Sequence, residues 1–529
     1  MLDWIDAHTV PYLITGLTLI GGSFILFFWN KKWAIWMLVL GSGVLAYFMA
    51  ILDPFLNLWD EQQHALVAKN MASNPFKPML IKEPVIEYDY KLWIANHIWI
   101  HKQPLFLWQM ALFVKILGAK VIAIRLPSVI MHALLPYLVY RIGKSVRNET
   151  AGFIAAIFIT LANYPLELVA GRYSTDHNDM AFLFYVTWSV LCWVEYVRTK
   201  ERKWLIWLGI SAGGAVLVKW LMGLLVYVCW FLVITIKNNF KFWQIKQYFV
   251  MIRPFLISLL VFLPWQIYCF IRFPKEAAYE LGTSASHFSN VVEGHSGDWD
   301  YHFVKGFQAL YFRENYFLAD WMPFMVLVLL AIGIWKMKNR TYQLFMGIIV
   351  AFVYVFFSLA ATKMNAFTII VMPIVLLGIS SAFVWFYELW SKYIKIQIVS
   401  YLMLGAILWS PVTEMFKLRE ITQRHSLDFP HMNDFRKEEI EEIQFIRRLE
   451  AHYGDQKIIA FNANYTVVGF IPLMFYTDYT AYGHMPSEQN IQTALIKGYK
   501  VVVIDRNDLP VHILQDDRLD IFPAFKDQM

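Results

Sequence analysis

Residues 59–64 read Trp-Asp-Glu-Gln-Gln-His, and residues 101–108 read His-Lys-Gln-Pro-Leu-Phe-Leu-Trp. The stretch that they bound, 58–108, lies between strongly apolar runs, yet it combines acids, bases, prolines and tryptophans. A hydrophobic core does not need that mixture, because charged side chains are almost never fully buried unless they are paired. We therefore interpret this stretch as a loop next to a membrane that carries the chemistry, and the rest of the chain as its scaffold.

The composition indicates a membrane protein. The 529 residues are 58% hydrophobic and only 16% charged, whereas a soluble domain averages roughly 25% charged and 45–50% apolar residues. The apolar residues form blocks of about 16–22, the length with which a helix crosses a bilayer. Continuous apolar runs favour helices over the closed barrels that lipid also permits. The sequence predicts an all-α polytopic membrane protein with about twelve transmembrane helices.

The positions of the basic residues predict the topology. The net charge of +6 is not interpreted as a nucleic-acid signal, because Lys and Arg lie mostly in short loops between apolar runs. Basic loops stay cytoplasmic, so Lys31-Lys32 faces in and the second helix delivers Asp60 to the outer side. The same alternation places two large loops on the outer side. They are the predicted catalytic loop 53–120, which should form short helices along the membrane surface, and the loop 274–320.

The composition changes after about residue 413. Residues 457–461 and 499–504 are apolar runs bounded by polar residues, typical of buried strands, and residues 438–452 and 486–497 are typical of amphipathic helices. Alternating strands and helices predict a small α/β domain over 414–529, on the outer side, after a membrane domain over 1–413.

Four acids at two outer junctions are candidate catalytic residues. Asp60 and Glu61 are adjacent in a helix and diverge by about 100°, so one would serve a substrate while the other braces the fold. The alternative is that Asp60 is a helix N-cap at the membrane surface. Asp176 and Asp179 lie at the second junction, where a cap is again the alternative for Asp179.

A set of cations accompanies these acids. Lys102 precedes an aromatic cluster, where its ammonium suits a phosphate; the alternative is a snorkelling lysine. Lys219 interrupts an apolar stretch, and an ionisable group there is a functional candidate. Arg172, Arg313 and Lys363 complete the set. Acids and cations at one membrane boundary indicate a lipid-phosphate substrate.

Several motifs, in order over about residues 58–375, resemble those of the GT-C superfamily of membrane glycosyltransferases. The similar branch is that of the protein O-mannosyltransferases and the lipid A aminoarabinose transferase. The matching segments are Asp60-Glu61, residues 102–108, Arg125-Leu126-Pro127-Ser128, residues 171–180, residues 215–220, and Lys363 with Pro373.

The resemblance implies a GT-C fold and a function. It implies transfer of a sugar from a polyprenyl-phosphate donor to a cell-envelope acceptor, which is a glycolipid of the lipid A type, a glycan or a protein. It also implies a bacterial inner membrane with a periplasmic active site. A departing phosphate needs cations rather than the protonating acid of a glycosidase, which fits an inverting displacement with Asp60 as base and the cations holding the phosphate.

The chain departs from the family pattern at two points. Two apolar spans precede Asp60, where the family usually has one, and Gln103 replaces a proline. In addition, Asp176 and Asp179 bracket the spacing of the family's second acid, so both stay candidates for it, with a slight preference for Asp179. His101 stands where some relatives carry an acid, so a divalent metal at His101 with an outer-loop histidine is a further hypothesis. No other cofactor is predicted.

Two other classes of protein stay open at this point. A transporter or flippase of lipid-linked sugars would have inverted repeats and midplane sites, and the sequence shows no repeat. A non-enzymatic membrane scaffold that presents residues 414–529 is the other class, but it would not explain the charged Lys219 within an apolar stretch.

Overall fold

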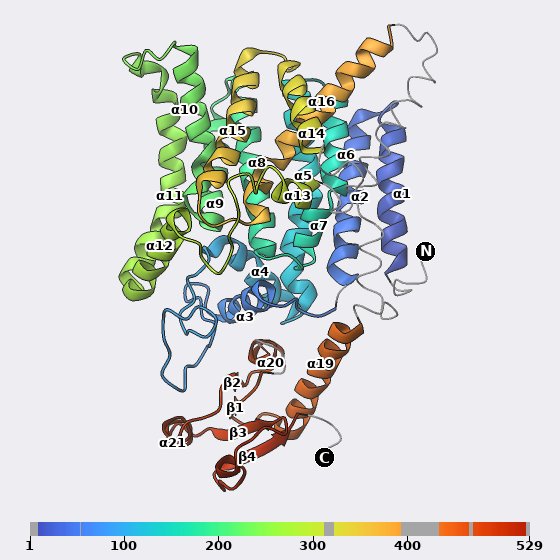
Figure 1. Ribbon diagram of the computed structural model, residues 1–529. Coiled ribbons are helices and arrows are strands. Elements are labelled where there is room, and N and C mark those ends of the chain that lie inside the picture. The colour runs from blue at the N-terminus through green and yellow to red at the C-terminus, as the bar shows by residue number, and fades with distance from the viewer. Residues whose placement is uncertain (1–8, 53, 312–321, 393–432, 465–468, 525–529) are drawn as a thin grey trace.

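The structure is a computed structural model that describes residues 9–52, 54–311, 322–392, 433–464 and 469–524. A bundle of helices makes up most of the molecule, and a small sheet with its own helices lies beyond one end of the bundle (Figure 1). We call this end the sheet end and the opposite end the basic end.

The bundle is built mainly from long apolar helices. They are α1 (Val10–Leu26), α2 (Lys31–Leu52), α5 (Val121–Val146), α6 (Glu149–Leu161), α7 (Asn163–Val169), α8 (Asp176–Thr199), α9 (Lys203–Lys219), α10 (Leu225–Lys237), α11 (Phe249–Arg272), α14 (Met322–Trp335), α15 (Arg340–Leu359) and α16 (Met372–Trp390). Shorter elements connect them: α3 (Asp60–Ser73), α4 (Pro104–Leu117), α12 (Pro274–Ser289), α13 (Lys305–Tyr311), η1 (Trp220–Leu224), η2 (Ile245–Gln247) and η3 (Asn365–Val371).

Within the described ranges, seven helical segments are long and apolar enough to cross a membrane, and the pair α6–α7, bent by 49°, makes an eighth. The helices α1 and α14 are apolar but shorter. The predicted fold class, a helical polytopic membrane protein, is confirmed. The last predicted span, which ended near Pro411, lies outside the described residues.

The loops that were predicted to share one side of the membrane meet at the basic end. Lys237 Nζ donates to Thr341 Oγ1 at 2.9 Å, and the amide of Lys338 donates to the carbonyl of Val146 at 2.8 Å. Arg141, near the end of α5, pairs with Glu195, near the end of α8, so α9, which follows α8, begins at the basic end and α10 ends there. Lys219, between these two helices, lies at the sheet end, so α9 and α10 form the predicted hairpin.

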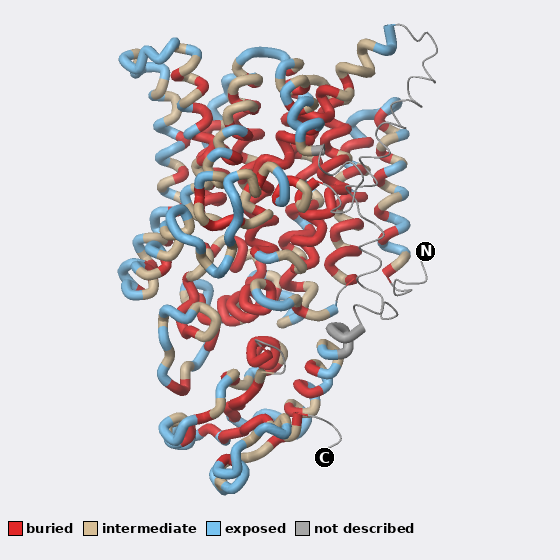
Figure 2. Tube along the Cα trace, viewed as in Figure 1, coloured by how far each residue is buried: buried red, intermediate tan, exposed pale blue. Residues whose placement is uncertain are grey.

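Burial is concentrated along the middle of the bundle and along α3 (Figure 2). Although α3 is polar, its residues Glu61, Gln62, Gln63 and His64 are all at most 2% exposed. The helix packs against α4, α5, α8 and α20. Burying polar groups is costly unless they are hydrogen-bonded. Glu61 and His64 have such partners, Arg125 and Asp176, whereas neither side-chain polar atom of Gln63 has one among the described residues.

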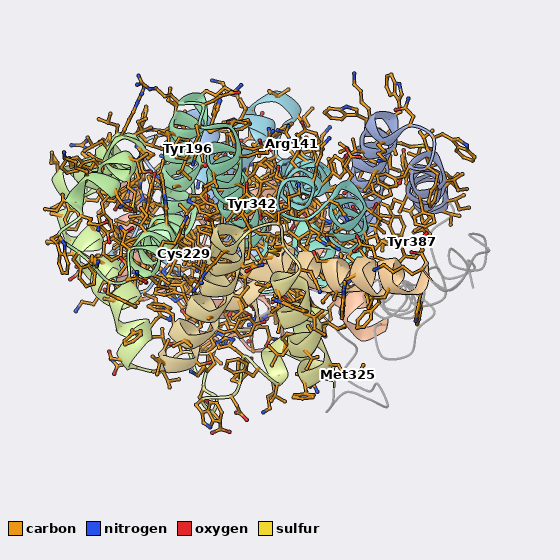
Figure 3. The ribbon with its side chains drawn as sticks, turned by 90° about the horizontal axis from the view of Figure 1, so that it is seen from above. Arg141, Tyr196, Cys229, Met325, Tyr342 and Tyr387 are labelled. Carbon is orange, nitrogen blue, oxygen red and sulfur yellow. The ribbon has the colours of Figure 1, made fainter. Side chains whose placement is uncertain are left out.

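Seen end-on, the α1–α2 pair lies at one edge of the bundle (Figure 3). Near the basic end, α5 and α6 meet at Gly143 and Gly152, where a Cβ added to Gly143 would lie 2.3 Å from the Gly152 Cα atom. Small residues allow such close helix packing in membranes.

The C-terminal region contains a four-stranded parallel sheet in the order β2-β1-β3-β4. Its elements are α19 (Asn433–Tyr453), β1 (Ile458–Phe461), α20 (Phe470–Tyr476), β2 (Thr480–Ala481), α21 (Glu488–Ile496), β3 (Lys500–Asp505), α22 (Val511–Leu514) and β4 (Leu519–Pro523). The predicted α/β fold is confirmed, with β1 and β3 where strands were expected. The short strand β2 and the strand β4 were not predicted.

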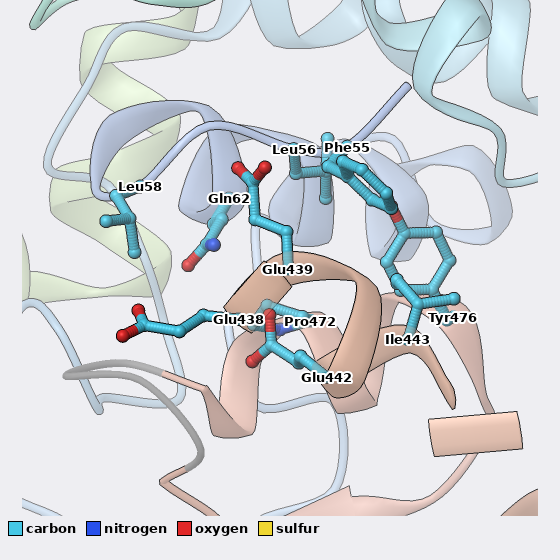
Figure 4. A pocket seen from close by; sticks show the side chains of 10 residues that line it. All are labelled: Phe55, Leu56, Leu58, Gln62, Glu438, Glu439, Glu442, Ile443, Pro472 and Tyr476. Carbon is cyan, nitrogen blue, oxygen red and sulfur yellow. The ribbon is translucent and has the colours of Figure 1, made fainter. Parts of the chain in front are cut away.

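A small pocket marks the junction of α19 with the membrane-proximal helices (Figure 4). Glu442 of α19 is only 6% exposed there, and its Oε1 atom has no hydrogen-bond partner among the described residues. Burial, together with the neighbouring Glu439, raises the pKa of Glu442 to about 8. Gln62 of α3 lines the same pocket, so α19 adjoins the helix that begins with Asp60.

Candidate active site

Asp60, the first residue of α3, ties two helix ends together. Its Oδ2 atom accepts a hydrogen bond from the amide of Thr175, the N-cap of α8, at 2.8 Å. The N-cap position of α3 belongs to Trp59, so Asp60 is not the cap. Burial raises the pKa of the Asp60 carboxyl, but Lys102, His64 and the Thr175 amide outweigh burial and hold this pKa below its usual value. Asp60 is therefore an anion, and no ion pair joins it to another described residue.

Asp179 lies one turn into α8 and is paired. Lys219 Nζ, at the end of α9, donates to Asp179 Oδ1 at 2.5 Å, and the Thr175 hydroxyl donates to Asp179 Oδ2. The Asp179 side chain is 1% exposed, whereas that of Lys219 is 26% exposed. The pair fixes the end of α9 against the start of α8 and leaves part of the ammonium accessible.

Lys102 belongs to a chain of three side chains. Its Nζ atom lies 3.3 Å from His101 Nε2, and His101 Nδ1 lies 3.1 Å from Glu280 Oε2. Burial and the Lys102 charge lower the pKa of His101, against the effect of Glu280. A neutral ring then donates from Nδ1 to Glu280 and accepts at Nε2 from Lys102. The ring also stacks on Trp93, with the centroids 4.8 Å apart.

These groups line one cavity at the sheet end of the bundle, with a volume of about 540 Å³. Asp60, Lys102, Asp179 and Lys219 all contribute to its wall. They come from four separate segments: α3, the residues before α4, α8 and α9. Among the acids that line the cavity, Asp60 and the exposed Glu293 form no ion pair with a described residue, and Lys102 and Lys219 supply two ammonium groups.

Strained backbone surrounds the cavity. Trp59, Thr175 and Trp220 line it with φ angles of 72°, 67° and 56°. Residues other than glycine avoid this region, at a cost of about 1–3 kcal/mol each, and such strain clusters at functional sites. Trp59 and Trp220 directly adjoin Asp60 and Lys219, so the strain occurs where charged groups are presented.

Glu61 was a candidate catalytic acid, but it does not line the cavity. Arg125 donates to both of its oxygens, from Nε at 2.6 Å and from Nη2 at 2.9 Å, and His177 Nε2 lies 3.2 Å away. Burial raises the pKa of Glu61, but Arg125 overrides burial and lowers it to about 2. Gly171, at φ +75°, leaves room for this carboxylate, because an added Cβ would lie 2.2 Å from Glu61 Cδ. Glu61 is thus a brace beneath the site.

Asp176 and Arg172 also lie away from the cavity wall. Asp176 Oδ1 lies 2.9 Å from His64 Nδ1, and both side chains are fully buried. Arg172 pairs with Glu167 at 3.1 Å. The turn before α8 therefore directs Asp179, rather than Asp176, toward the cavity.

Lys363, another predicted cation, is not brought to the cavity. Lys363 is 4% exposed, and its ammonium donates to the carbonyls of Phe357, Ser358 and Ala360 at the end of α15. It stabilises a helix terminus instead of facing the cavity. Arg313 lies outside the described residues.

Sequence reasoning missed part of the cavity wall. Glu280 and His287 belong to α12, within a segment that was predicted only as an outer loop. Pro274 at the first position of this helix and the amphipathic residues after it were the available signal. Trp93 and Trp220 also line the cavity.

The hypothesis of a divalent metal at His101 stays a prediction. Among the described residues, no group of three or more His, Cys, Asp or Glu side chains is arranged to hold a metal ion. His101 is occupied by Lys102 and Glu280, as described above.

Residues 101–268 match the family model of dolichyl-phosphate-mannose-protein mannosyltransferases. The matched segment includes Lys102, Asp179 and Lys219. No curated protein matches the chain by sequence.

Solved structures resemble most of the chain. ArnT from Cupriavidus metallidurans bound to undecaprenyl phosphate is similar with a TM-score of 0.61 at 13% identity, over 88% of each chain. The oligosaccharyltransferase from Archaeoglobus fulgidus tethered with an acceptor peptide is similar with a TM-score of 0.55 at 11% identity, over 87% of this chain and 64% of that one. Together with the family-model match, these similarities confirm the resemblance to the GT-C superfamily, and the chain has the GT-C membrane glycosyltransferase fold.

Proposed function

We propose that this protein is a glycosyltransferase that moves a sugar from a polyprenyl phosphate to a cell-envelope acceptor. The observation that carries the proposal is the convergence of Asp60, Lys102, Asp179 and Lys219 on one cavity. The comparisons support the donor class, because ArnT is described bound to undecaprenyl phosphate and the archaeal oligosaccharyltransferase AglB in complex with a dolichol-phosphate. The acceptor is a glycolipid, a glycan or a protein.

The charges of the cavity suit an inverting displacement. The acceptor oxygen attacks the anomeric carbon while the bond from that carbon to the phosphate oxygen breaks, and the electron pair leaves with the phosphate. Lys102 and Lys219 stabilise the charge that develops on this phosphate, which is the kind of interaction that contributes most in many enzymes. Asp60 orients the acceptor hydroxyl and takes its proton as the new bond forms.

We place the site at the outer face of the membrane, which in a bacterium is the periplasmic side. The basic loops lie at the opposite end of the bundle, and such loops stay cytoplasmic. A lipid-linked sugar in the outer leaflet can then reach the cavity from the side of the bundle, and the acceptor from the aqueous side.

The test uses the purified protein reconstituted with a polyprenyl-phosphate sugar and an extract of envelope acceptors. Mass spectrometry should detect a glycosylated acceptor and free polyprenyl phosphate in equal amounts. Lys102→Ala should raise the KM for the donor. Movement of the donor across the bilayer with no glycosylated product would instead identify a transporter.

A further inference from the structure

A lysine-rich groove lies between the loop before α4 and the C-terminal sheet. It comprises two adjoining cavities of about 170 and 400 Å³, which share Lys82, Glu83, Lys457 and Tyr499 in their walls. We call the combined space the lysine groove. Its five lysines are Lys69, Lys77, Lys82, Lys457 and Lys497.

Specific contacts hold the two walls of the lysine groove together. Lys497 Nζ donates to the carbonyl of Val85 at 2.6 Å. Tyr499 donates its hydroxyl proton to Glu83 at 3.0 Å, and the amide of Val85 donates to Tyr482 at 3.2 Å. The groove is therefore a defined junction of two parts of the chain.

The lysine groove has more positive than negative charge. Five lysines face two acids that line the same cavities, Glu83 and Asp478. Glu83 is bonded to Tyr499, and Asp478 lies 3.3 Å from Lys69. The ammonium groups of Lys77, Lys82 and Lys457 form no hydrogen bond or ion pair with any other residue in the described ranges.

Lys69 and Lys82 are close enough to repel each other. The pKa of Lys69 is lowered by burial first and further by the charge of Lys82, although Asp478 opposes both. Lysines gathered in this way without enough counter-charge favour an anion between them. Lys82, Lys457 and Lys497 are exposed, so an anion can enter from solvent.

The lysine groove and the catalytic cavity lie along the same helix. Lys69 follows Asp60 by nine residues on α3, which is about 14 Å along the helix axis and about two and a half turns around it, so the two side chains lie on opposite faces of α3. The loop that carries Lys77 and Lys82 continues to Lys102 of the cavity. In Figure 1 the C-terminal sheet lies on the far side of α3 from the bundle, and the walls of the groove come from α3, the loop before α4 and this C-terminal region.

We propose that the lysine groove binds phosphate or carboxylate groups of a glycan-containing acceptor while the acceptor's hydroxyl lies at Asp60. This inference rests on the proposed function and deepens it by assigning an anionic acceptor. The separation along α3 requires an acceptor that extends over at least about 14 Å, the length of several sugar rings. Because the C-terminal region, which lies beyond α3 from the bundle, forms one wall of the groove, we expect the ligand of the groove to be the headgroup of an acceptor and not the lipid headgroups of the surrounding membrane.

The test compares two charge-matched triple variants of the full-length protein. The groove variant is Lys77→Gln/Lys82→Gln/Lys457→Gln, and the control is Lys91→Gln/Lys275→Gln/Lys305→Gln, whose lysines are exposed and line neither cavity of the groove. Binding of inorganic tripolyphosphate is measured by calorimetry at fixed salt. Transfer is measured with envelope glycans that have been separated into anionic and neutral fractions.

We expect the groove variant to bind tripolyphosphate at least tenfold more weakly, while the control changes less than twofold. The KM for the anionic acceptors should rise about tenfold in the groove variant, with kcat and the KM for the donor unchanged. Equal loss of binding in both variants, or an unchanged KM for the anionic fraction, would overturn the proposal.

Two further outcomes separate the alternatives. If the groove variant loses binding to phosphatidylglycerol vesicles but not to tripolyphosphate, the groove is a membrane contact and the proposal is wrong. If tripolyphosphate binding depends on the three lysines but the wild-type protein transfers no sugar, the anion site is supported and the proposed transferase function is the part that fails.

Discussion

Lys219 and Asp179 lie 40 residues apart in the chain, yet Lys219 Nζ donates to Asp179 Oδ1 at 2.5 Å. This bond joins the end of α9 to the start of α8 at the wall of the cavity. The pair also neutralises Asp179, whereas Asp60 forms no ion pair with any described residue. This contact therefore makes Asp179 the structural partner of Lys219 and leaves Asp60 available to act as a base.

Lys219→Met should destabilise the protein by about 1–3 kcal/mol, because it leaves a buried carboxylate without its partner. The double variant Lys219→Met/Asp179→Asn should recover most of this stability but not the transfer activity, because Lys219 would no longer stabilise the phosphate. Chemical denaturation and transfer rates of the three proteins check both statements. A double variant with full activity would remove Lys219 from the site.

The chain Glu280–His101–Lys102 predicts a pH dependence. The pKa of His101 is lowered from its usual value, so the ring is neutral near pH 7 and becomes protonated only as the pH falls below 6.5. Protonation removes the acceptor of Lys102, so kcat/KM for the donor should fall along an acid limb below pH 6.5. Glu280 raises the pKa of His101, so Glu280→Gln should move this limb to lower pH.

His101→Gln is the matched control for the acid limb, because it cannot be protonated there. Its kcat/KM should lack the limb that the wild type shows below pH 6.5. An identical acid limb in the wild type, Glu280→Gln and His101→Gln would contradict the role of this chain.

Trp59→Gly separates strain from function. Glycine adopts the φ of 72° without cost, so the variant should lose about 1–3 kcal/mol of backbone strain and resist denaturation at least as well as the wild type. We expect its transfer activity to fall at least tenfold, because the indole that lines the cavity is lost. Trp59→Phe keeps both the strain and an aromatic ring and should retain most activity. Full activity of Trp59→Gly would mean that Trp59 does not contact the substrate.

Glu442 predicts a dependence of stability on pH at the junction in Figure 4. Its folded-state pKa of about 8 lies above its usual value of 4.5, so the folded protein retains a proton that the unfolded chain releases. The contribution of protonated Glu442 to the free energy of unfolding is present in full below about pH 4.5 and is lost as the pH rises through about 8. Glu442→Gln should be more stable than the wild type at pH 8 and equally stable at pH 4.5, as measured by denaturation. A constant difference at both pH values would contradict this.

The bundle could be predicted from the sequence because lipid leaves helices as the main solution for long apolar runs. Basic loops such as Lys31-Lys32 set the alternation of the spans, and Lys219 was conspicuous because it interrupts an apolar stretch. The meeting of the basic loops at one end of the bundle agrees with that alternation.

The division of labour among the acids could not be predicted in the same way. Asp60 and Glu61 are adjacent, and the backbone turn at Trp59 decides which one faces the cavity. Glu61 faces Arg125 because Gly171, distant in sequence, leaves it room. Such choices depend on contacts between distant segments.

Two predictions failed because the local sequence was ambiguous: Lys363 was expected to bind the lipid phosphate, and the segment of α12 was expected to be a loop. An ammonium near a membrane boundary can serve a ligand or a helix end, and only its position shows that Lys363 binds the carbonyls that end α15. Glu280 was missed because α12 is short and amphipathic and lies in a segment without an apolar run.

The role of Asp60 as the base is tested by the single-turnover rate of sugar transfer from a polyprenyl-phosphate donor in wild type and Asp60→Asn. Asparagine keeps the size of the side chain but cannot accept a proton, so the rate should fall by about 10²- to 10⁴-fold, with donor binding and resistance to denaturation retained. Transfer by Asp60→Asn within a few-fold of the wild-type rate would contradict this role.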